Sequence, residues 1–308
     1  LVNRGTLVGE MLCPSNGATT SKAIEQMLTM PYAQFGDQSC VDRLGRDSYT
    51  DEMGQEVKNI ARKIHDQQIS PLTEERSSLV NVKMLEQGYN TNFAATWFLV
   101  RSDVRLDDEG NLTAGDAKCS DFDSKGLNVT KGPLTTRLLD SGKTPSNTVP
   151  LLCDASASGF LSASVGEILS GSFYTTPIVG GPIGNRRRVD NDADGTPETD
   201  NSFFMSVPAF DGSTARSGAD GWLKAWNFDT RQDYRGMAPV HQGVVNVLMA
   251  DGSIRGLLDE NNDGFINNGF DGGADSPGDT VYWTSSEIEA GPLDLASFYS
   301  LISKGDQN

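Results

Sequence analysis

The sequence predicts an α+β protein in which a mostly antiparallel β-sheet packs against one main helix and long loops are stabilised by calcium. Three observations predict this class: helical spacing of apolar residues before residue 79, short β-rich runs after it, and two loops rich in Asp, Asn and Gly. We expect one principal domain over residues 1–308. Within it, residues 1–78 form an irregular and helical entry segment, 79–258 form a β-rich core with long insertions, and 259–308 hold a calcium loop and the C-terminal segment.

Two helices are expected near the N-terminus and one near the C-terminus. Apolar residues recur at helical spacing over Ser21–Met30. The main helix is expected from Asp51 to Gln68, because two acidic residues suit its N-terminal end and Pro71 stops it. Its apolar stripe consists of Met53, Val57, Ile60 and Ile64. A short amphipathic helix is expected over Asp294–Ser303.

Strands are expected where short β-rich runs are separated by Gly, Asn, Asp and Ser clusters. Examples are Leu79–Leu85, Asn92–Val100 and Phe203–Val207. The clearest pair is Val244–Ala250 followed by Ser253–Leu258, because the intervening Asp-Gly dipeptide is typical of a type I′ hairpin. Alternation places Val245, Val247 and Met249 on one face of the first strand.

The charge balance narrows the partners and the compartment. Asp and Glu total 42 against 25 Lys and Arg, and the net charge of −17 repels nucleic acid and anionic lipid headgroups. No apolar run approaches the length of a membrane helix. The chain begins at Leu1 rather than Met, so we expect that an export signal or anchor was removed or omitted. Membrane attachment would then come only through that N-terminal segment.

Two acidic loops carry the prediction of Ca²⁺. A calcium loop needs side-chain oxygens at positions one, three and five, a glycine with positive φ at position six, and a backbone carbonyl at position seven. The first loop spans residues 190–200 and the second spans residues 259–267. The predicted ligands of the first are Asp190, Asp192, Asp194, Thr196, Glu198 and Asp200. Those of the second are Asp259, Asn261, Asp263, Phe265 and Asn267.

The second loop matches the pattern better, since it adds an apolar residue at position eight that anchors such loops to a core. Both loops depart from the EF-hand at position twelve, where Asn201 and Phe270 stand in place of a bidentate Glu. They are therefore more similar to isolated calcium loops of extracellular modules. The alternative is that Asp, Asn and Gly simply form turns. Two loops with the same alternation favour metal, in a stabilising and not a catalytic role.

Four cysteines are widely spaced and form no CxxC pair, which argues against zinc. We expect two disulfides in an oxidising compartment, with four buried free thiols as the alternative. Of the three possible connectivities we favour Cys13 with Cys40 and Cys119 with Cys153, because local closure is the simpler route.

A specific motif surrounds the predicted hairpin. His241 is followed by nine residues and then by Asp251-Gly252, in H-Q-G-V-V-N-V-L-M-A-D-G-S-I-R. This resembles the H-x9-DG signature of the DUF1559 family of planctomycete-type prepilin-like exported proteins, and Leu12–Asn16 resembles the family's L-C-P-S-D stretch. The resemblance implies a pilin-like, exported protein whose sheet packs behind a helix.

These observations lead us to expect an exported, non-enzymatic structural subunit of a cell-surface, pilus-like or pseudopilus-like assembly, stabilised by calcium. It would be extracellular, periplasmic or on the cell surface, and would associate with itself or with other envelope proteins. One alternative is a calcium-dependent binding module or adhesin, with Trp222 and Trp226 as a sugar-stacking pair. Another is a secreted hydrolase that pairs His241 with Asp251. A strand of seven residues separates those two, so we interpret His241, Asp251 and Gly252 as fold determinants.

Overall fold

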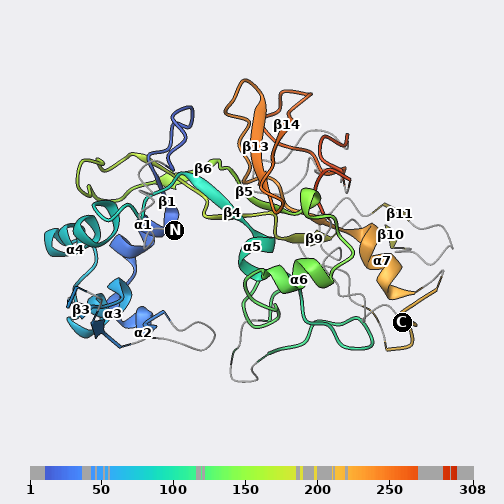
Figure 1. Ribbon diagram of the computed structural model, residues 1–308, viewed down its shortest axis with the longest axis horizontal. Helices are drawn as coiled ribbons and strands as arrows, with labels where there is room; N and C mark the ends of the chain where they lie inside the picture. Colours follow the sequence, from blue (N-terminus) through green and yellow to red (C-terminus); the bar gives the residue numbers. More distant parts are fainter. Residues whose placement is uncertain are drawn as a thin grey trace. The chain divides into compact units, whose positions relative to one another are not determined.

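The computed structural model forms two compact units (Figure 1). The first unit comprises residues 1–94 and 155–177, and the second comprises residues 95–154 and 178–308. The expectation of one principal domain stays a prediction. The structure describes residues 11–36, 43–45, 47–50, 53–54, 56–115, 119, 122–184, 188–189, 198–199, 210, 212–218, 221–269, 287–291 and 293–296.

The first unit combines short helices with a small three-stranded sheet. Its helices are α1 (Lys22–Thr29), α2 (Tyr32–Gly36), α3 (Ile60–Asp66), α4 (Glu74–Val80) and a π-helical turn (Asn81–Leu85). Its strands are β1 (Thr20–Ser21), β2 (Tyr49–Thr50), β3 (Glu56–Val57), β6 (Ala157–Phe160) and β7 (Phe173–Thr175). β7 lies between β1, with which it is parallel, and β6, with which it is antiparallel.

A buried arginine joins the helices of the first unit. Arg76, on α4, is fully buried and donates to the carbonyls of Ile69 at 3.0 Å and Met30 at 2.5 Å. Its guanidinium also lies over the Phe35 ring, 5.4 Å from the centroid. Burial lowers the pKa of Arg76. The Arg76 guanidinium therefore lies next to carbonyl groups just after the C-terminal ends of α1 and α3. The negative end of a helix dipole favours a positive charge at this position.

The sequence predicted α1 well but placed the next helix wrongly. Ile24 and Leu28 of α1 are fully buried, as the helical spacing requires. The main helix does not start at Asp51. α3 begins at Ile60, where the Asn59 side chain accepts a hydrogen bond from the backbone N–H of Ala61 at 2.8 Å. Before it the chain turns back in the β2–β3 pair, with Gly54 at φ 78°.

Of two further predicted strands, one is wrong throughout and one is wrong in part. Residues 79–85 are helical, because Thr73 caps α4 by accepting from the N–H of Arg76 and the π-helical turn continues it. In the predicted strand at residues 92–100, only β4 (Phe93–Thr96) is extended. There Thr96 ends the strand, and its hydroxyl accepts from the N–H of Leu99 to cap α5 (Trp97–Arg101).

The second unit is built on a five-stranded sheet in the order β14–β13–β5–β4–β8 (Figure 1). The strands that enter this sheet beside β4 are β5 (Pro150–Asp154), β8 (Ile178–Val179), β13 (Val244–Met249) and β14 (Ile254–Leu258). β13 is antiparallel to both β14 and β5, whereas β4 and β8 are parallel. Most described pairings are antiparallel, as predicted.

Two further pairs of strands and three short helical elements complete the described part of this unit. The strands are β9 (Pro182–Gly184), β10 (Arg188–Val189), β11 (Glu198–Thr199) and β12 (Thr230–Gln232), and the helices besides α5 are α6 (Thr136–Ser141), a 3₁₀ turn (Ser146–Thr148) and α7 (Trp222–Asp229). β9 pairs with β12 and β10 pairs with β11. Together these elements make a mixed α/β protein with several sheets.

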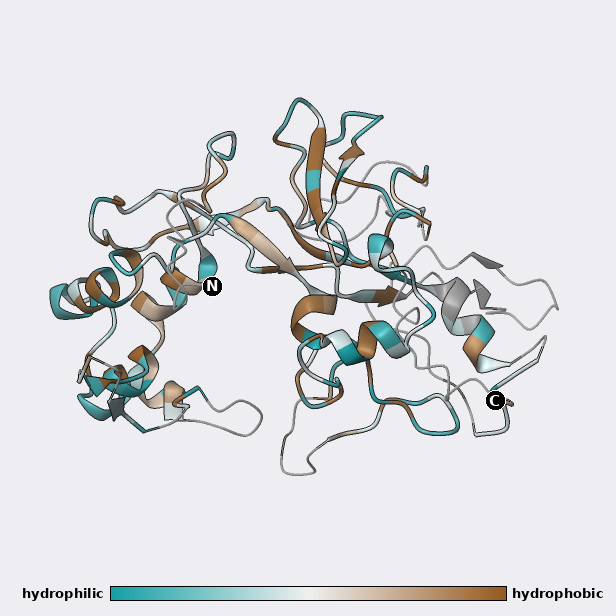
Figure 2. Ribbon diagram, in the orientation of Figure 1, coloured by the Kyte–Doolittle hydropathy of each residue, from teal (hydrophilic) through white to brown (hydrophobic). Residues whose placement is uncertain are grey.

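The core of the second unit lies under one face of the sheet and around α5 and α7. Val245, Val247 and Met249 are fully buried, which confirms the predicted face of β13, and Figure 2 shows this strand as largely apolar. A core cluster beside α5 contains Trp222 and Trp226 of α7 packed with Trp97 and Phe98 of α5. The alternation of apolar residues therefore determines which face of β13 is buried, and so it orients the hairpin.

No helix among the described residues has the length and apolar character needed to cross a membrane.

Candidate functional site

A tight turn precedes β13 and positions His241. The backbone N–H of His241 donates to the carbonyl of Val244 at 3.1 Å, and the N–H of Val244 donates back at 3.2 Å. Gln242 and Gly243 both have positive φ, 55° and 86°. The carbonyl of Gly243 then accepts from the N–H of Asp259 at 2.8 Å. His241 is therefore fixed at the open end of the hairpin, next to the start of the second acidic loop.

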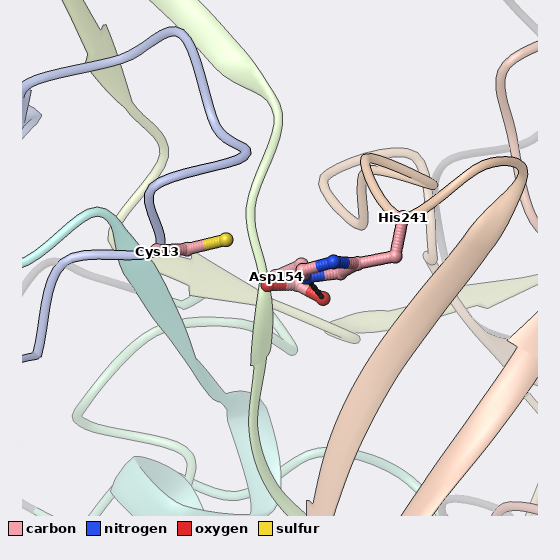
Figure 3. A group of neighbouring side chains, drawn as sticks. All are labelled: Cys13, Asp154 and His241. Atoms are coloured by element: carbon pink, nitrogen blue, oxygen red, sulfur yellow. Dashed lines mark ion pairs between the residues drawn. The ribbon is translucent and has the colours of Figure 1, made fainter.

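His241 contacts a carboxylate that the sequence did not single out. Asp154, the last residue of β5, is fully buried, and its Oδ2 lies 3.4 Å from His241 Nε2 (Figure 3). The same oxygen accepts from the N–H of Asn246 at 2.8 Å. Asp154 Oδ1 is also buried and has no hydrogen-bond partner in the described part of the chain. The half-exposed imidazole thus lies between this carboxylate and solvent.

Asp154 gave only a weak signal in the sequence. It directly follows the apolar run Pro150–Cys153, and a polar residue at this position is typical of the end of a strand. Its relation to His241 depends on the pairing of β5 with β13, where Val247 lies opposite Cys153. That pairing joins residues about ninety positions apart, and local pattern does not reveal it.

Asp251 lies at the other end of β13, as the strand length predicts. Its carboxylate accepts from the N–H and the hydroxyl of Ser253 at 2.9 and 2.6 Å. These hydrogen bonds lower the pKa of Asp251. The pair of His241 and Asp251 that a hydrolase would need is not formed, since the whole of β13 separates them.

The turn at Asp251 differs from the predicted type I′ geometry. The N–H of Met249 donates to the carbonyl of Ser253 at 2.8 Å, and the N–H of Gly252 donates to the carbonyl of Met249 at 3.0 Å. Only Gly252 of the dipeptide has a positive φ, 85°. The hairpin therefore has a three-residue connection ending in a left-handed glycine. Gly252 keeps its predicted role as a fold determinant in this different turn.

The second acidic loop has much of the geometry expected of a calcium loop. Gly264, at position six, has φ 86° as predicted, and Ile266, at position eight, is fully buried. The carboxylate of Asp259 accepts from the N–H groups of Asp263 at 3.2 Å and Gly264 at 2.9 Å. Asp259 is nearly buried. The first acidic residue thus faces the inside of the turn.

The side-chain oxygens in the middle of the loop also point towards the inside of the turn. Asn261 Oδ1 accepts from the N–H of Asp263 at 2.9 Å, and Asp263 Oδ1 accepts from the N–H of Phe265 at 2.9 Å. The amide of Asn261 also donates to Asp263 Oδ2 at 3.2 Å. Oxygens of positions one, three and five therefore gather around one turn of backbone. Asn267, at position nine, is fully buried.

The carboxylate of Glu289, a residue outside the loop, accepts hydrogen bonds from the loop backbone. Glu289 Oε1 accepts from the N–H groups of Glu260 at 2.7 Å and Asn261 at 3.2 Å, and Oε2 accepts from the N–H of Asn267 at 2.8 Å. The backbone of Glu289 also donates to the carbonyl of Asn267 at 3.0 Å. Sequence reasoning missed Glu289, because it follows the loop by more than twenty residues at no recognisable spacing.

Most of the first acidic loop lies outside the described residues. This applies to Asp190, Asp192, Asp194, Thr196 and Asp200. Glu198 begins β11, whose backbone pairs with β10. The predicted calcium site at residues 190–200 stays a prediction.

The favoured disulfide pairings are wrong. Cys13 and Cys153 are buried thiols that form no disulfide, so neither Cys13–Cys40 nor Cys119–Cys153 is formed. Cys40 lies outside the described residues. Burial raises the pKa of Cys153, and the adjacent charge of Asp154 raises it further. Cys153 lies inside the sheet, where a strand pattern and a cysteine count cannot distinguish a buried thiol from half of a disulfide.

The two tryptophans proposed for sugar stacking are core residues. Trp222 is 2% exposed and Trp226 is 0% exposed. Their indole N–H groups donate to the carbonyls of Asp108 and Gly110. Because both rings pack inside the second unit, neither can present a face to a ligand.

The comparisons with known proteins give one finding. A family model described as "Protein of unknown function (DUF1559)" matches residues 56–264, more than half of the chain, and this stretch includes Asp154, His241 and Asp251. Neither the curated proteins nor the solved structures yielded a match.

Proposed function

Because this chain belongs to the DUF1559 family, we propose that it is an exported structural subunit of a cell-surface or pilus-like assembly, with Ca²⁺ in the second acidic loop stiffening its central hairpin. Export, a pilin-like arrangement and the absence of catalysis are parts of this proposal. The observation that carries it is the loop at residues 259–267, which follows β14 directly.

The donor set of this loop fits calcium. Calcium prefers carboxylate, amide and carbonyl oxygens. Asp259, Asn261 and Asp263 offer side-chain oxygens on one turn, and Phe265 and Asn267 occupy the positions that supply the remaining oxygens in such loops. The left-handed Gly264 makes the required sharp bend. Nitrogen and sulfur ligands, which zinc would need, are absent from residues 259–267.

Stabilisation of the loop would reach the hairpin through backbone hydrogen bonds. The N–H of Asp259 bonds to Gly243 in the His241 turn, and Glu289 bonds to both ends of the loop. A cation supplies positive charge among carboxylates that otherwise repel one another. Holding Asp259 in place would then hold the open end of β13 and β14, next to the buried Asp154.

The alternatives receive less support from the site. An adhesin would need exposed aromatic groups near the metal, and Trp222 and Trp226 are buried. A hydrolase would need a histidine–carboxylate pair with a reacting group, and Asp251 is too far from His241 to be its partner. Asp154 does contact His241, but its Oδ2 also holds the backbone of Asn246, as a structural carboxylate does.

Calcium titration of the purified chain tests the proposal. We expect calorimetry to show two sites per chain with a Kd of about 0.1–1 mM each, typical of extracellular modules. At a concentration about ten times Kd, each site adds about 1.4 kcal/mol to the free energy of unfolding, so chelation should lower the melting temperature by a few degrees.

Asp263→Asn isolates the second loop, because asparagine keeps the oxygen that accepts from Phe265 and removes the charge. This variant should bind calcium more weakly at one of the two sites, because a lower ligand charge lowers the affinity of such loops. Asp140→Asn is the matched control, since Asp140 is an exposed residue of α6 and carries the same change of charge. If chelation leaves the melting temperature of the wild type unchanged and calorimetry shows no binding, the proposal fails.

A further inference from the structure

We propose that the free edge of β14 pairs with β14 of a second copy of this chain, antiparallel about a two-fold axis at Gly256. This inference rests on the proposed function, because it names the contact through which the subunit associates and the effect of calcium on it. It is carried by the direction of the β14 backbone, by the exposure of its side chains and by the charges around it.

Within the described part of the chain, the backbone of β14 is hydrogen-bonded to another strand on one side only. Met249 bonds to Ser253 and Gly243 bonds to Asp259, so alternate residues of β14, including Arg255 and Leu257, direct their backbone groups to β13. The intervening Ile254, Gly256 and Leu258 direct theirs away from it. β14 is the terminal strand of the sheet among the described strands. Its register with β13 is regular over five residue pairs, without a bulge.

The side chains of Ile254 and Leu258 lie on the exposed face of the sheet. Ile254 is 72% exposed and Leu258 is 49% exposed, whereas Leu257 is buried. Their cross-strand neighbours on that face are Leu248 and Val244, which are only partly buried. The strand therefore combines apolar side chains with backbone groups that no other described residue pairs with, a combination that soluble proteins usually avoid at an edge.

The one charged side chain of β14 interacts with a residue outside the strand and does not protect the strand edge. Edge strands often carry a Lys or Arg that keeps other strands away. The only cation of β14 is Arg255, whose guanidinium donates to the carbonyl of Asp294 at 2.7 Å and lies 3.4 Å from its carboxylate. Its charge is thereby directed to Asp294. Ile254, Gly256 and Leu258 carry no charge.

The sequence of the edge is complementary to itself. In an antiparallel pair centred on Gly256, Ile254 of each copy lies opposite Leu258 of the second copy. All three pairs have outward backbone groups in both copies, so each pair exchanges two hydrogen bonds. Gly256 at the centre places no side chain on the axis. A two-fold contact needs such self-complementarity, because both copies present the same patch.

The same register explains why calcium would control the contact. Ser253 lies opposite Asp259 of the second copy, so the Asp251 turn of each copy comes next to the acidic loop of the other. Without a cation these carboxylates repel, and the net charge of −17 on each chain adds to the repulsion. Calcium in the loop reduces both effects. Dimerisation should therefore be stronger with calcium than with a chelator.

Sedimentation velocity of the full chain, with calcium and with a chelator, tests this pairing. The wild type should form a dimer with calcium and be mainly monomeric with chelator at the same concentration. Ile254→Lys should weaken dimerisation at least tenfold while leaving the melting temperature of the monomer unchanged, because this side chain is exposed. Leu169→Lys is the matched control, since Leu169 is 68% exposed and lies in the first unit.

A mixture of Ile254→Cys and Leu258→Cys chains tests the register. Opposite residues in hydrogen-bonded antiparallel pairs have Cα atoms about 5.5 Å apart, within the range that a disulfide spans. The mixture should therefore form a cross-linked dimer under mild oxidation, and each variant alone should not. Cross-linking of either variant alone to the same extent would overturn this register.

The outcomes separate this inference from the proposed function. If calorimetry shows calcium bound while the wild type remains a monomer up to about 100 µM, the edge pairing is overturned and the calcium proposal stands. If a dimer forms equally with and without chelator and Ile254→Lys abolishes it, the edge pairing stands and its calcium dependence is overturned. A dimer that Ile254→Lys does not weaken overturns the edge pairing.

Discussion

The two ends of the β13–β14 hairpin are stabilised in different ways. At the open end, His241 meets Asp154 from a strand far away in the sequence, and Gly243 bonds to the start of the acidic loop. At the turn, the carboxylate of Asp251 bonds to Ser253, two residues along the chain. One end therefore depends on tertiary structure, and the other on local geometry.

This difference shows that the two landmarks of one motif have separate roles. His241 and Asp251 are ten residues apart in the sequence, yet only His241 faces a buried carboxylate. A buried charge is costly unless it is hydrogen-bonded, so changes at the open end should affect the whole second unit. An exposed turn carboxylate is hydrated in either state. Substitutions at the two ends should therefore differ in the size of their effects.

The largest expected effect is that of Asp154→Ala. The substitution leaves the backbone N–H of Asn246 without its acceptor and removes the partner of His241, which should cost about 2–3 kcal/mol of unfolding free energy. Chemical denaturation monitored by circular dichroism measures it. Asp154→Asn should recover part of the loss, since its amide oxygen can accept from Asn246.

Asp140→Ala is the matched control for that comparison, because Asp140 is exposed on α6. An Asp154→Ala protein as stable as the Asp140→Ala protein would contradict the assignment of Asp154 as the buried anchor of the hairpin.

His241→Gln should have an intermediate effect. Glutamine retains a donor but cannot reproduce the ring that covers Asp154, so we expect a loss of about 1 kcal/mol. Assembly, measured by sedimentation, should weaken with stability. Any measurable activity should stay intact. A folded, assembly-competent His241→Gln protein that has lost a defined enzymatic turnover would contradict the structural role.

The sequence predicted features that depend on local pattern. The buried face of β13, the helix α1, the left-handed Gly264 and the buried Ile266 follow from alternation, helical spacing and turn chemistry. Each of these needs only a few neighbouring residues to be specified. The same reasoning placed the acidic loop directly after the hairpin.

Features that depend on distant residues were missed. The missed residues are Asp154, Glu289 and Arg76. Each of them contacts carbonyls, N–H groups or side chains that only the fold brings near it. Charged residues usually lie on the surface, so no pattern indicated the burial of Asp154 and Arg76 or the bridging role of Glu289. The long helix from Asp51 failed for a related reason, because an apolar stripe was counted across Gly54, where the chain turns.

The smallest expected effect is at the turn, and its pH dependence identifies it. Hydrogen bonds from Ser253 lower the pKa of Asp251, which means that the folded chain favours the ionised form more than the unfolded chain does. This contribution is therefore present above the unfolded pKa of about 3.9 and is lost as pH falls through the lower folded pKa. Asp251→Asn removes the charge and keeps an acceptor for Ser253. Its melting temperature should lie slightly below that of the wild type at pH 7, by less than His241→Gln, and the two curves should converge in acid. A gap that persists undiminished well below pH 3 would show that Asp251 acts through something other than its carboxylate charge, and would weaken the contrast between the two ends of the hairpin.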